Sequence, residues 1–191
     1  MRYRRTDVVE RALAVLDRYG LADLTMRRLG TELGVQPSAL YHHFANKQSL
    51  LAAVADEILA RGSRPVPATA GWEDRAAAVC VGLREAMLAY RDGAEVVATV
   101  HAFRLGAAGP AEDLESTLRA AGLPDGLART AARTLLHYVF GHVSEEQTHL
   151  QAGSAGAIAD GPPEESDFLT GLSLVLDGIR VRREARADRS G

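Results

Sequence analysis

The sequence predicts an all-α protein, with an N-terminal three-helix domain of the helix-turn-helix type and a larger helical domain after it. Alanine, leucine, arginine and glycine are abundant while runs of aromatic and β-branched residues are scarce, a composition that favours helices. Apolar residues recur at helical spacing along most of the chain. A glycine turn separates two short helical patterns within residues 24–50. We expect residues 1–50, with a connecting helix to about residue 61, to form the first domain and residues 62–191 the second.

Cysteine content, hydropathy and charge exclude several classes of protein. The single cysteine, Cys80, cannot form an intrachain disulfide, which fits a reducing compartment. The sequence has neither an apolar run of about eighteen residues nor an apolar signal core, so we expect a cytoplasmic protein that does not enter a membrane. The net charge is −3, yet residues 1–50 are net positive and the remainder is net negative. Only the N-terminal part therefore suits a polyanion such as DNA.

The first two helices are predicted from their ends and their apolar spacing. Thr6 is the expected N-cap of the first helix, which ends at Gly20. Thr25 can accept a hydrogen bond from the unpaired N–H groups that begin the second helix. Gly34 ends this helix, because glycine enters a left-handed turn without a Cβ penalty.

A short third helix is expected after this turn, followed by a longer fourth. Pro37 fits a first helical turn, where its missing N–H costs nothing, and Leu40 and Phe44 lie on the inner side at i, i+4 spacing. Small and polar side chains are left for the outer side. Asn46 then caps the fourth helix, which is expected from residue 47 to about residue 61.

A dense set of motif residues lies in register over residues 6–58. It comprises the LT-x-R-x-L-G pattern ending at Gly30, the LGV of residues 33–35, and the string ALYHHFANK of residues 39–47. This set resembles the DNA-binding domain of the TetR family of bacterial transcriptional repressors. The resemblance implies that the third helix enters the major groove and that a double-stranded DNA operator is a partner.

The resemblance carries DNA-contacting roles onto eight residues. Arg27 is placed for a base edge, where arginine is the usual partner of guanine, while Tyr41, His43 and Lys47 are expected on phosphates. Tyr41 could instead pack on the first helix, and His42 could simply be exposed. The set is completed by the residues of the third, recognition helix and its approach, and comprises Arg27 of the second helix, Gln36, Ser38, Ala39, Tyr41, His42 and His43 of the recognition helix and its approach, and Lys47 at the start of the fourth helix.

The second domain is predicted to hold five helices. Two prolines and two glycines within residues 62–71 mark the boundary before it. The expected helices cover residues 72–90, 95–103, 111–121, 125–150 and 167–186, and a loop rich in glycine, alanine, serine and proline covers residues 151–166.

Three strings in this half, YRDGAEVVATVH, HYVFGHVSEEQTH and FLTGLSLVLDGI, are similar to the tetracycline repressor branch of the same family. In that branch the long helix and the last helix of each subunit build a four-helix dimer interface, so the resemblance implies a homodimer. The last helix is apolar on more than one face, which requires more than one partner element. Burial of both faces within one subunit is the alternative. Small residues that would permit close helix approach are Gly171, Ser173, Gly178, Gly141 and Ser144.

The resemblance also implies a ligand pocket that differs from the one in that branch. There a histidine and a glutamate hold the magnesium ion of the drug chelate; here the histidine position falls on Val97, and only the glutamate persists, as Glu145. At two further positions that branch has polar side chains that hold the drug, whereas this chain has the apolar Val79 and Leu114. No response to tetracycline is therefore expected. A small, largely apolar inducer is expected instead. The predicted lining is Val79, Leu83, Val97, Val100, His101, Phe103, Leu114, Leu118, Leu135, Tyr138, His142 and Glu145.

The resemblance implies negative control of transcription. The dimer would hold the operator, and a ligand would displace residues 95–103, which push the helix that begins at Lys47 and change the spacing of the two recognition helices. Activation rather than repression remains open at this point, as do the inducer, the operator sequence and the regulated genes.

A rival interpretation rests on a possible metal site. His142, Glu145, Glu146 and His149 fall at i, i+3, i+4 and i+7, a spacing that can bind zinc or a similar ion. A metal-responsive regulator, or a helical small-molecule-binding protein without operator activity, would then follow. The spacing is not the H-E-x-x-H of zinc proteases, and the sequence contains no phosphate loop, nucleophile elbow or paired cysteines. We therefore expect no enzyme, no cofactor and no bound metal.

Overall fold

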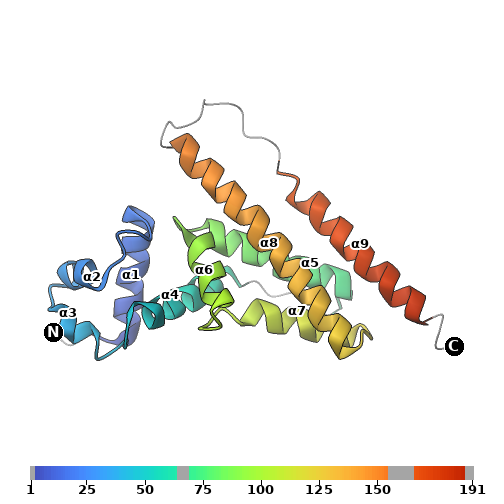
Figure 1. The fold of residues 1–191 in the computed structure, drawn as a ribbon, viewed down its shortest axis with the longest axis horizontal. Helices are drawn as coiled ribbons and strands as arrows, with labels where there is room; N and C mark the ends of the chain where they lie inside the picture. The colour runs from blue at the N-terminus through green and yellow to red at the C-terminus, as the bar shows by residue number, and fades with distance from the viewer. Residues whose placement is uncertain (1–2, 64–68, 155–165, 188–191) are drawn as a thin grey trace. The chain divides into compact units, whose positions relative to one another are not determined.

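The computed structural model describes residues 3–63, 69–154 and 166–187, and within these ranges the chain is helical and contains no strand (Figure 1). This confirms the all-α prediction. The described helices are α1 (Arg5–Tyr19), α2 (Met26–Leu33), α3 (Pro37–Leu40), α4 (Lys47–Gly62), α5 (Trp72–Leu88), α6 (Gly93–Ala102), α7 (Gly109–Ala120), α8 (Asp125–Ser154) and α9 (Phe168–Ala187). Among the described residues, no helix is long and apolar enough to cross a membrane.

The chain divides into two compact units. The first comprises Met1–Ser63 and Glu85–Ala108, and the second comprises Arg64–Arg84 and Gly109–Gly191. The division therefore falls within α5, and α6 belongs to the same unit as the helix-turn-helix.

Helix α1 begins earlier than predicted, and Thr6 is not its N-cap. Arg4 takes the cap position in an extended conformation, and the carboxylate of Asp7 accepts a hydrogen bond from the Arg4 N–H at 2.7 Å. Thr6 lies exposed within the first turn. The helix thus begins one residue before Thr6, and a carboxylate in its first turn satisfies the N–H of the cap residue.

Several other boundaries differ from the prediction. The third helix ends at Leu40, and Tyr41, His42 and His43 lie in the turn that follows it. Helix α6 begins at Gly93, and α8 continues to Ser154. Parts of the predicted 62–71 boundary and of the 151–166 loop, residues 64–68 and 155–165, lie outside the described residues.

The core of the first unit joins the helix-turn-helix to α1 and α4. Helices α1 and α2, α2 and α3, and α1 and α4 pack in pairs, and α4 also packs on α6. Their fully buried side chains include Leu16, Leu29, Leu40, Phe44 and Leu50. Burial of each such side chain stabilises the unit by about 1.5–3 kcal/mol. The apolar residues of α3 and α4, which their spacing in the sequence predicted to face inward, contribute to this core.

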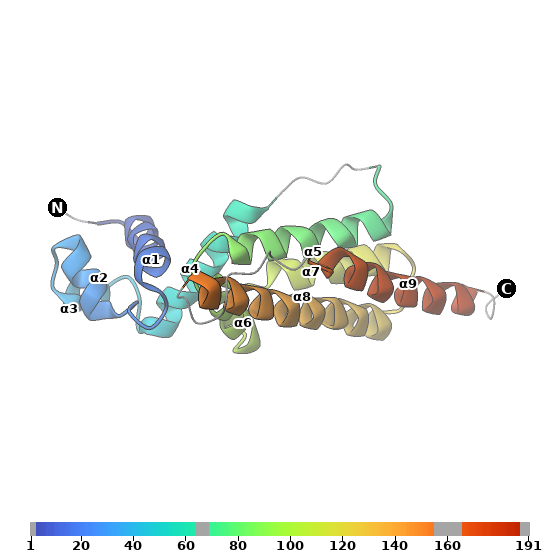
Figure 2. The ribbon, with the colours of Figure 1, turned by 90° about the horizontal axis from the view of Figure 1, so that it is seen from above.

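The second unit is built on α8. Helix α7 packs against α8, and α9 lies alongside α8 in both views (Figure 1, Figure 2). One face of α9 is buried, through Phe168, Leu172, Leu176 and Ile179. A Cβ at Gly171 would lie 2.3 Å from the Tyr138 hydroxyl oxygen, so this glycine permits the close approach of the two helices.

Candidate nucleic-acid interface and ligand-binding residues

Two glycines shape the helix-turn-helix for different reasons. Gly34 has φ +67°, a left-handed conformation, with open space where a Cβ would project. Gly30 is helical, but a Cβ there would lie 2.9 Å from the Val35 carbonyl oxygen. At the other end of α2, the Thr25 hydroxyl accepts the Arg28 N–H at 3.1 Å, as predicted. The turn therefore needs one glycine for its backbone conformation and the other for the close packing of α2.

The predicted DNA-contacting residues keep access to solvent. The side chains classed as exposed are Arg27, Gln36, Ser38, Tyr41 and His42, and those that are half-buried are Ala39, His43 and Lys47. Leu40 and Phe44, which alternate with them, are buried. The local pattern of small, polar and aromatic outer residues around a buried pair is what a major-groove reader requires.

The neighbouring arginines of α2 have different surroundings. Arg27 is exposed. The Arg28 guanidinium lies 3.7 Å from the centroid of the Tyr19 ring and pairs with Asp23 at 3.1 Å. Arg28 therefore fastens α2 to the end of α1 and the following loop, whereas the Arg27 side chain is available to a partner.

The basic residue at the start of α4 also has a contact within the unit. The Lys47 ammonium lies 3.5 Å from the Leu21 carbonyl oxygen, in the loop between α1 and α2. A single long hydrogen bond leaves two of the three ammonium donors for another acceptor, such as a phosphate.

The predicted ligand-binding residues are divided between the two compact units. In the first unit Val97 and Val100 are buried, His101 is half-buried, and the Phe103 side chain is 65% exposed. In the second unit Leu83, Leu114, Leu118 and Leu135 are buried, Val79, Tyr138 and His142 are half-buried, and Glu145 is exposed. Six of the apolar members are thus core residues of their own unit, whereas Phe103 is exposed and Val79 half-buried, and the polar members keep some access to solvent.

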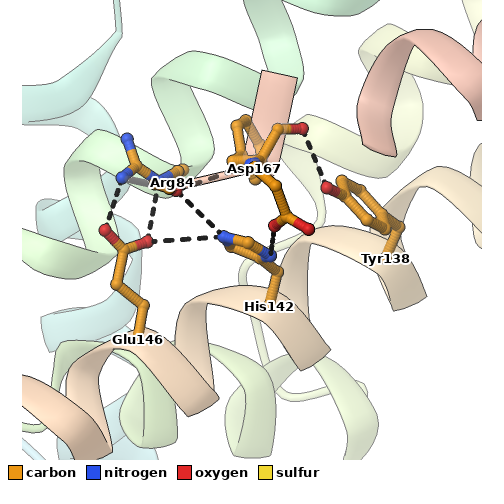
Figure 3. A network of polar contacts seen from close by, with 7 residues as sticks. Arg84, Tyr138, His142, Glu146 and Asp167 are labelled. Atoms are coloured by element: carbon orange, nitrogen blue, oxygen red, sulfur yellow. Dashed lines mark hydrogen bonds and ion pairs between the residues drawn. The ribbon is translucent and has the colours of Figure 1, made fainter. Parts of the chain in front are cut away.

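A polar network that sequence reasoning missed joins α5, α8 and the start of α9 (Figure 3). Arg84 makes two hydrogen bonds to the Glu146 carboxylate, one of them from Nε at 2.9 Å. His142 lies between two carboxylates, with Nε2 3.8 Å from Glu146 and Nδ1 3.7 Å from Asp167 (Figure 3). The bidentate geometry gives the Arg84 pair a fixed orientation that surface ion pairs usually lack.

The same network holds the first residue of α9. The Tyr138 hydroxyl donates to the Phe168 carbonyl oxygen at 2.8 Å, and the two rings stack with centroids 5.5 Å apart (Figure 3). Burial and the negative charge of Asp167 raise the pKa of Tyr138, so its hydroxyl remains a donor at neutral pH. Only the pairing of residues distant in sequence, 84 with 146 and 138 with 168, reveals this arrangement.

The candidate metal ligands do not all lie together. His142 is near Glu146, whereas Glu145 and His149 are exposed. Among the residues that the structure describes, no group of three or more histidine, cysteine, aspartate or glutamate side chains is arranged to hold a metal ion.

A helix-turn-helix with an exposed outer face, joined to a second helical unit, defines a DNA-binding regulator. Residues 8–54 match the family described as "Bacterial regulatory proteins, tetR family", and residues 64–166 match "Tetracyclin repressor-like, C-terminal domain". The chain belongs to the TetR family.

Individual relatives are similar over nearly the whole chain. The tetracycline repressor protein class A from transposon 1721 of Escherichia coli is 34% identical over 198 residues, covering 92% of this chain and 90% of that protein. The crystal structure of Mycobacterium smegmatis BioQ is 42% identical with a TM-score of 0.85, over 93% of this chain and 97% of that one. BioQ with its natural double-stranded DNA operator is 42% identical with a TM-score of 0.81, over 93% and 98% of the two chains.

Proposed function

We propose that this protein is a transcriptional repressor that binds a double-stranded DNA operator as a homodimer and is released by a small, largely apolar inducer. The observation that carries the proposal is the outer face of the helix-turn-helix, where Arg27 to Lys47 offer the side chains that DNA recognition needs. The likeness to BioQ, which was solved with its operator, supports it. The site of action would be the cytoplasm, where bacterial DNA lies.

The proposed division of labour follows the chain. Residues 1–50, with the connecting helix to about residue 61, would bind DNA, and residues 62–191 would bind the inducer and form the dimer. In the first part Arg27 would contact a base edge, and Tyr41, His43 and Lys47 would contact phosphates. Gln36, Ser38, Ala39 and His42 would complete the interface.

The surface of α9 supports a homodimer. Leu174 is 68% exposed and Val181 is 60% exposed, and Gly178 lies between them on the face opposite the buried one. A Cβ at Gly178 or at Gly141 of α8 would meet open space in the single chain. An apolar stripe with small residues offers a second copy a close helix contact, and a dimer supplies the two recognition helices that two half-sites require.

Release by an inducer would use α6. Helix α6 packs on α4, and the helix-turn-helix precedes α4 in the chain. A ligand that shifts α6 would therefore shift the helix-turn-helix. A coupling of about 1–3 kcal/mol between ligand and DNA would change the affinity for the operator about 5- to 150-fold. The pocket position Val97 is 1% exposed and has no group that could ligate a metal, which is why a magnesium-bound tetracycline should not act as inducer.

A gel shift on the DNA immediately upstream of the gene tests the proposal. The wild-type protein should shift this DNA in a salt-dependent manner, because phosphate contacts release counterions. Arg27→Ala and Tyr41→Ala should weaken the shift, and tetracycline with magnesium should leave it unchanged. Absence of a shift on this DNA and on a random-sequence library would contradict the operator-binding function.

A further inference from the structure

The loop that follows α6 is connected to α4 by a contact that the packing of apolar side chains does not explain. The Asp56 carboxylate, on α4, accepts a hydrogen bond from the Ala107 N–H at 2.8 Å. On the other side of the same residue, the Ala107 carbonyl oxygen lies 3.1 Å from Nδ1 of His101, on α6. Because a carbonyl oxygen only accepts, Nδ1 carries the proton in this contact. Ala107 thus connects His101 of α6 to Asp56 of α4.

The turn that presents Ala107 has an unusual backbone. Arg104 and Ala107 both have φ 55°, a left-handed conformation that residues with a side chain rarely adopt. Gly106 lies between them, and a Cβ there would be 3.0 and 3.2 Å from the two carboxylate oxygens of Asp56. Such a turn persists only where surrounding contacts hold it, and Asp56 supplies a charge-assisted one.

We propose that Asp56 is a positioning residue that sets the orientation of α4, and with it the spacing of the two recognition helices, through the Ala107 N–H. This rests on the proposed operator-binding function and adds a residue to it. His101 belongs to the predicted ligand-binding set, so a ligand that takes the hydrogen bond of His101 Nδ1 removes one of the two contacts that hold Ala107. The Asp56 contact is then the point at which a change in α6 reaches α4.

The test compares Asp56→Ala with Asp56→Asn. Both variants remove the same negative charge, but the asparagine amide oxygen can still accept the Ala107 N–H whereas alanine cannot. Gly106→Ala is the third variant, because its Cβ displaces the carboxylate from the side of the turn. Thermal unfolding of each variant reports separately on stability.

Two readouts are measured on the full-length protein. The first is the dissociation constant for the upstream DNA. The second is the distance distribution between spin labels attached at Ala22→Cys in the two helix-turn-helix domains of the dimer. Ala22 is exposed, while the native Cys80 is 0% exposed and would remain unlabelled.

The expected result is that Asp56→Ala and Gly106→Ala broaden the distance distribution and weaken operator binding about fivefold or more, while Asp56→Asn resembles the wild type in both. Equal behaviour of Asp56→Ala and Asp56→Asn would overturn the proposal, since the hydrogen bond would then be irrelevant. If the wild type bound no DNA, the proposed function would fail, and the label distances of the two variants would still decide the role of Asp56.

Discussion

Arg27 and Arg28 are adjacent on α2 but should respond differently to substitution. Arg27 is exposed, and a bidentate contact to a base is worth about 1–3 kcal/mol, so Arg27→Ala should weaken operator binding about 10- to 100-fold without lowering the unfolding temperature. Arg28 stacks on Tyr19 and pairs with Asp23, so Arg28→Ala should lower the free energy of unfolding by about 1 kcal/mol. Fluorescence anisotropy and urea denaturation of both variants check this, and a reversed pattern would show that the two roles were assigned wrongly.

Cys80 should be unreactive in the folded protein. Burial of its thiol raises the pKa of Cys80 from 9.0 to about 12, and the thiolate is the reactive form. At pH 8 the native protein should therefore react with iodoacetamide far more slowly than the urea-unfolded protein. Because the unfolded thiol ionises first, native stability should fall as the pH rises from about 9 towards 12. Rapid alkylation of the native protein at pH 8 would contradict the burial of this residue.

At the scale of the helix-turn-helix, two glycine substitutions should be destabilising for different reasons. Gly34→Ala meets open space, so its cost should be the left-handed backbone conformation, about 1–2 kcal/mol, and Gly34→Asn should recover part of it. Gly30→Ala should cost about 1–3 kcal/mol through the contact with the Val35 carbonyl oxygen, and asparagine should be worse still. Chemical denaturation of the four variants measures both. Recovery by asparagine at residue 30 would refute the steric explanation there.

The packing of α9 on α8 should depend on the pair Gly171 and Tyr138. A Cβ at residue 171 would lie 2.3 Å from the Tyr138 hydroxyl oxygen and 2.8 Å from Cζ, so Gly171→Ala must displace a ring that also donates to the Phe168 carbonyl oxygen. We expect a loss of about 1–3 kcal/mol. In a double-mutant cycle with Tyr138→Ala, the alanine at 171 should cost much less, because the obstructing ring is gone. Additive losses would mean that the Cβ at residue 171 and the Tyr138 ring do not clash.

For the whole molecule, the exposed stripe of α9 should determine the oligomeric state. Leu174→Glu places a charge on this stripe and should yield a monomer in sedimentation equilibrium, because desolvating an unpaired charge at the interface is costly. Operator binding should fall with it, since one recognition helix reads only one half-site. Ser116→Glu, on the exposed side of α7, adds the same charge away from α9 and serves as control. A dimeric Leu174→Glu protein would place the interface elsewhere.

The success of the sequence-based predictions followed the range of the interactions involved. Thr25, Gly34 and Asn46 were assigned correctly because a cap or a left-handed turn depends on neighbouring residues alone. Thr6 was assigned wrongly because the helix begins at Arg5 with Arg4 as its cap residue, and the side chain that closes this cap is that of Asp7 in the first turn. The end of α3 was also missed, since Tyr41 to His43 have no helix-breaking residue among them. The predicted DNA-contacting residues were taken from a motif, and they stay a prediction.

Local sequence was sufficient for the helix order, for the turn of the helix-turn-helix and for which apolar residues are buried, because periodicity and capping act within a few residues. It was insufficient for every contact between distant side chains. That Arg28 stacks on Tyr19, that Arg84 holds Glu146, and that Asp56 reaches the Ala107 N–H depends on how helices pack in three dimensions. These contacts require the core to hold the helices in place, and that placement has no signature in the residues beside them in the chain.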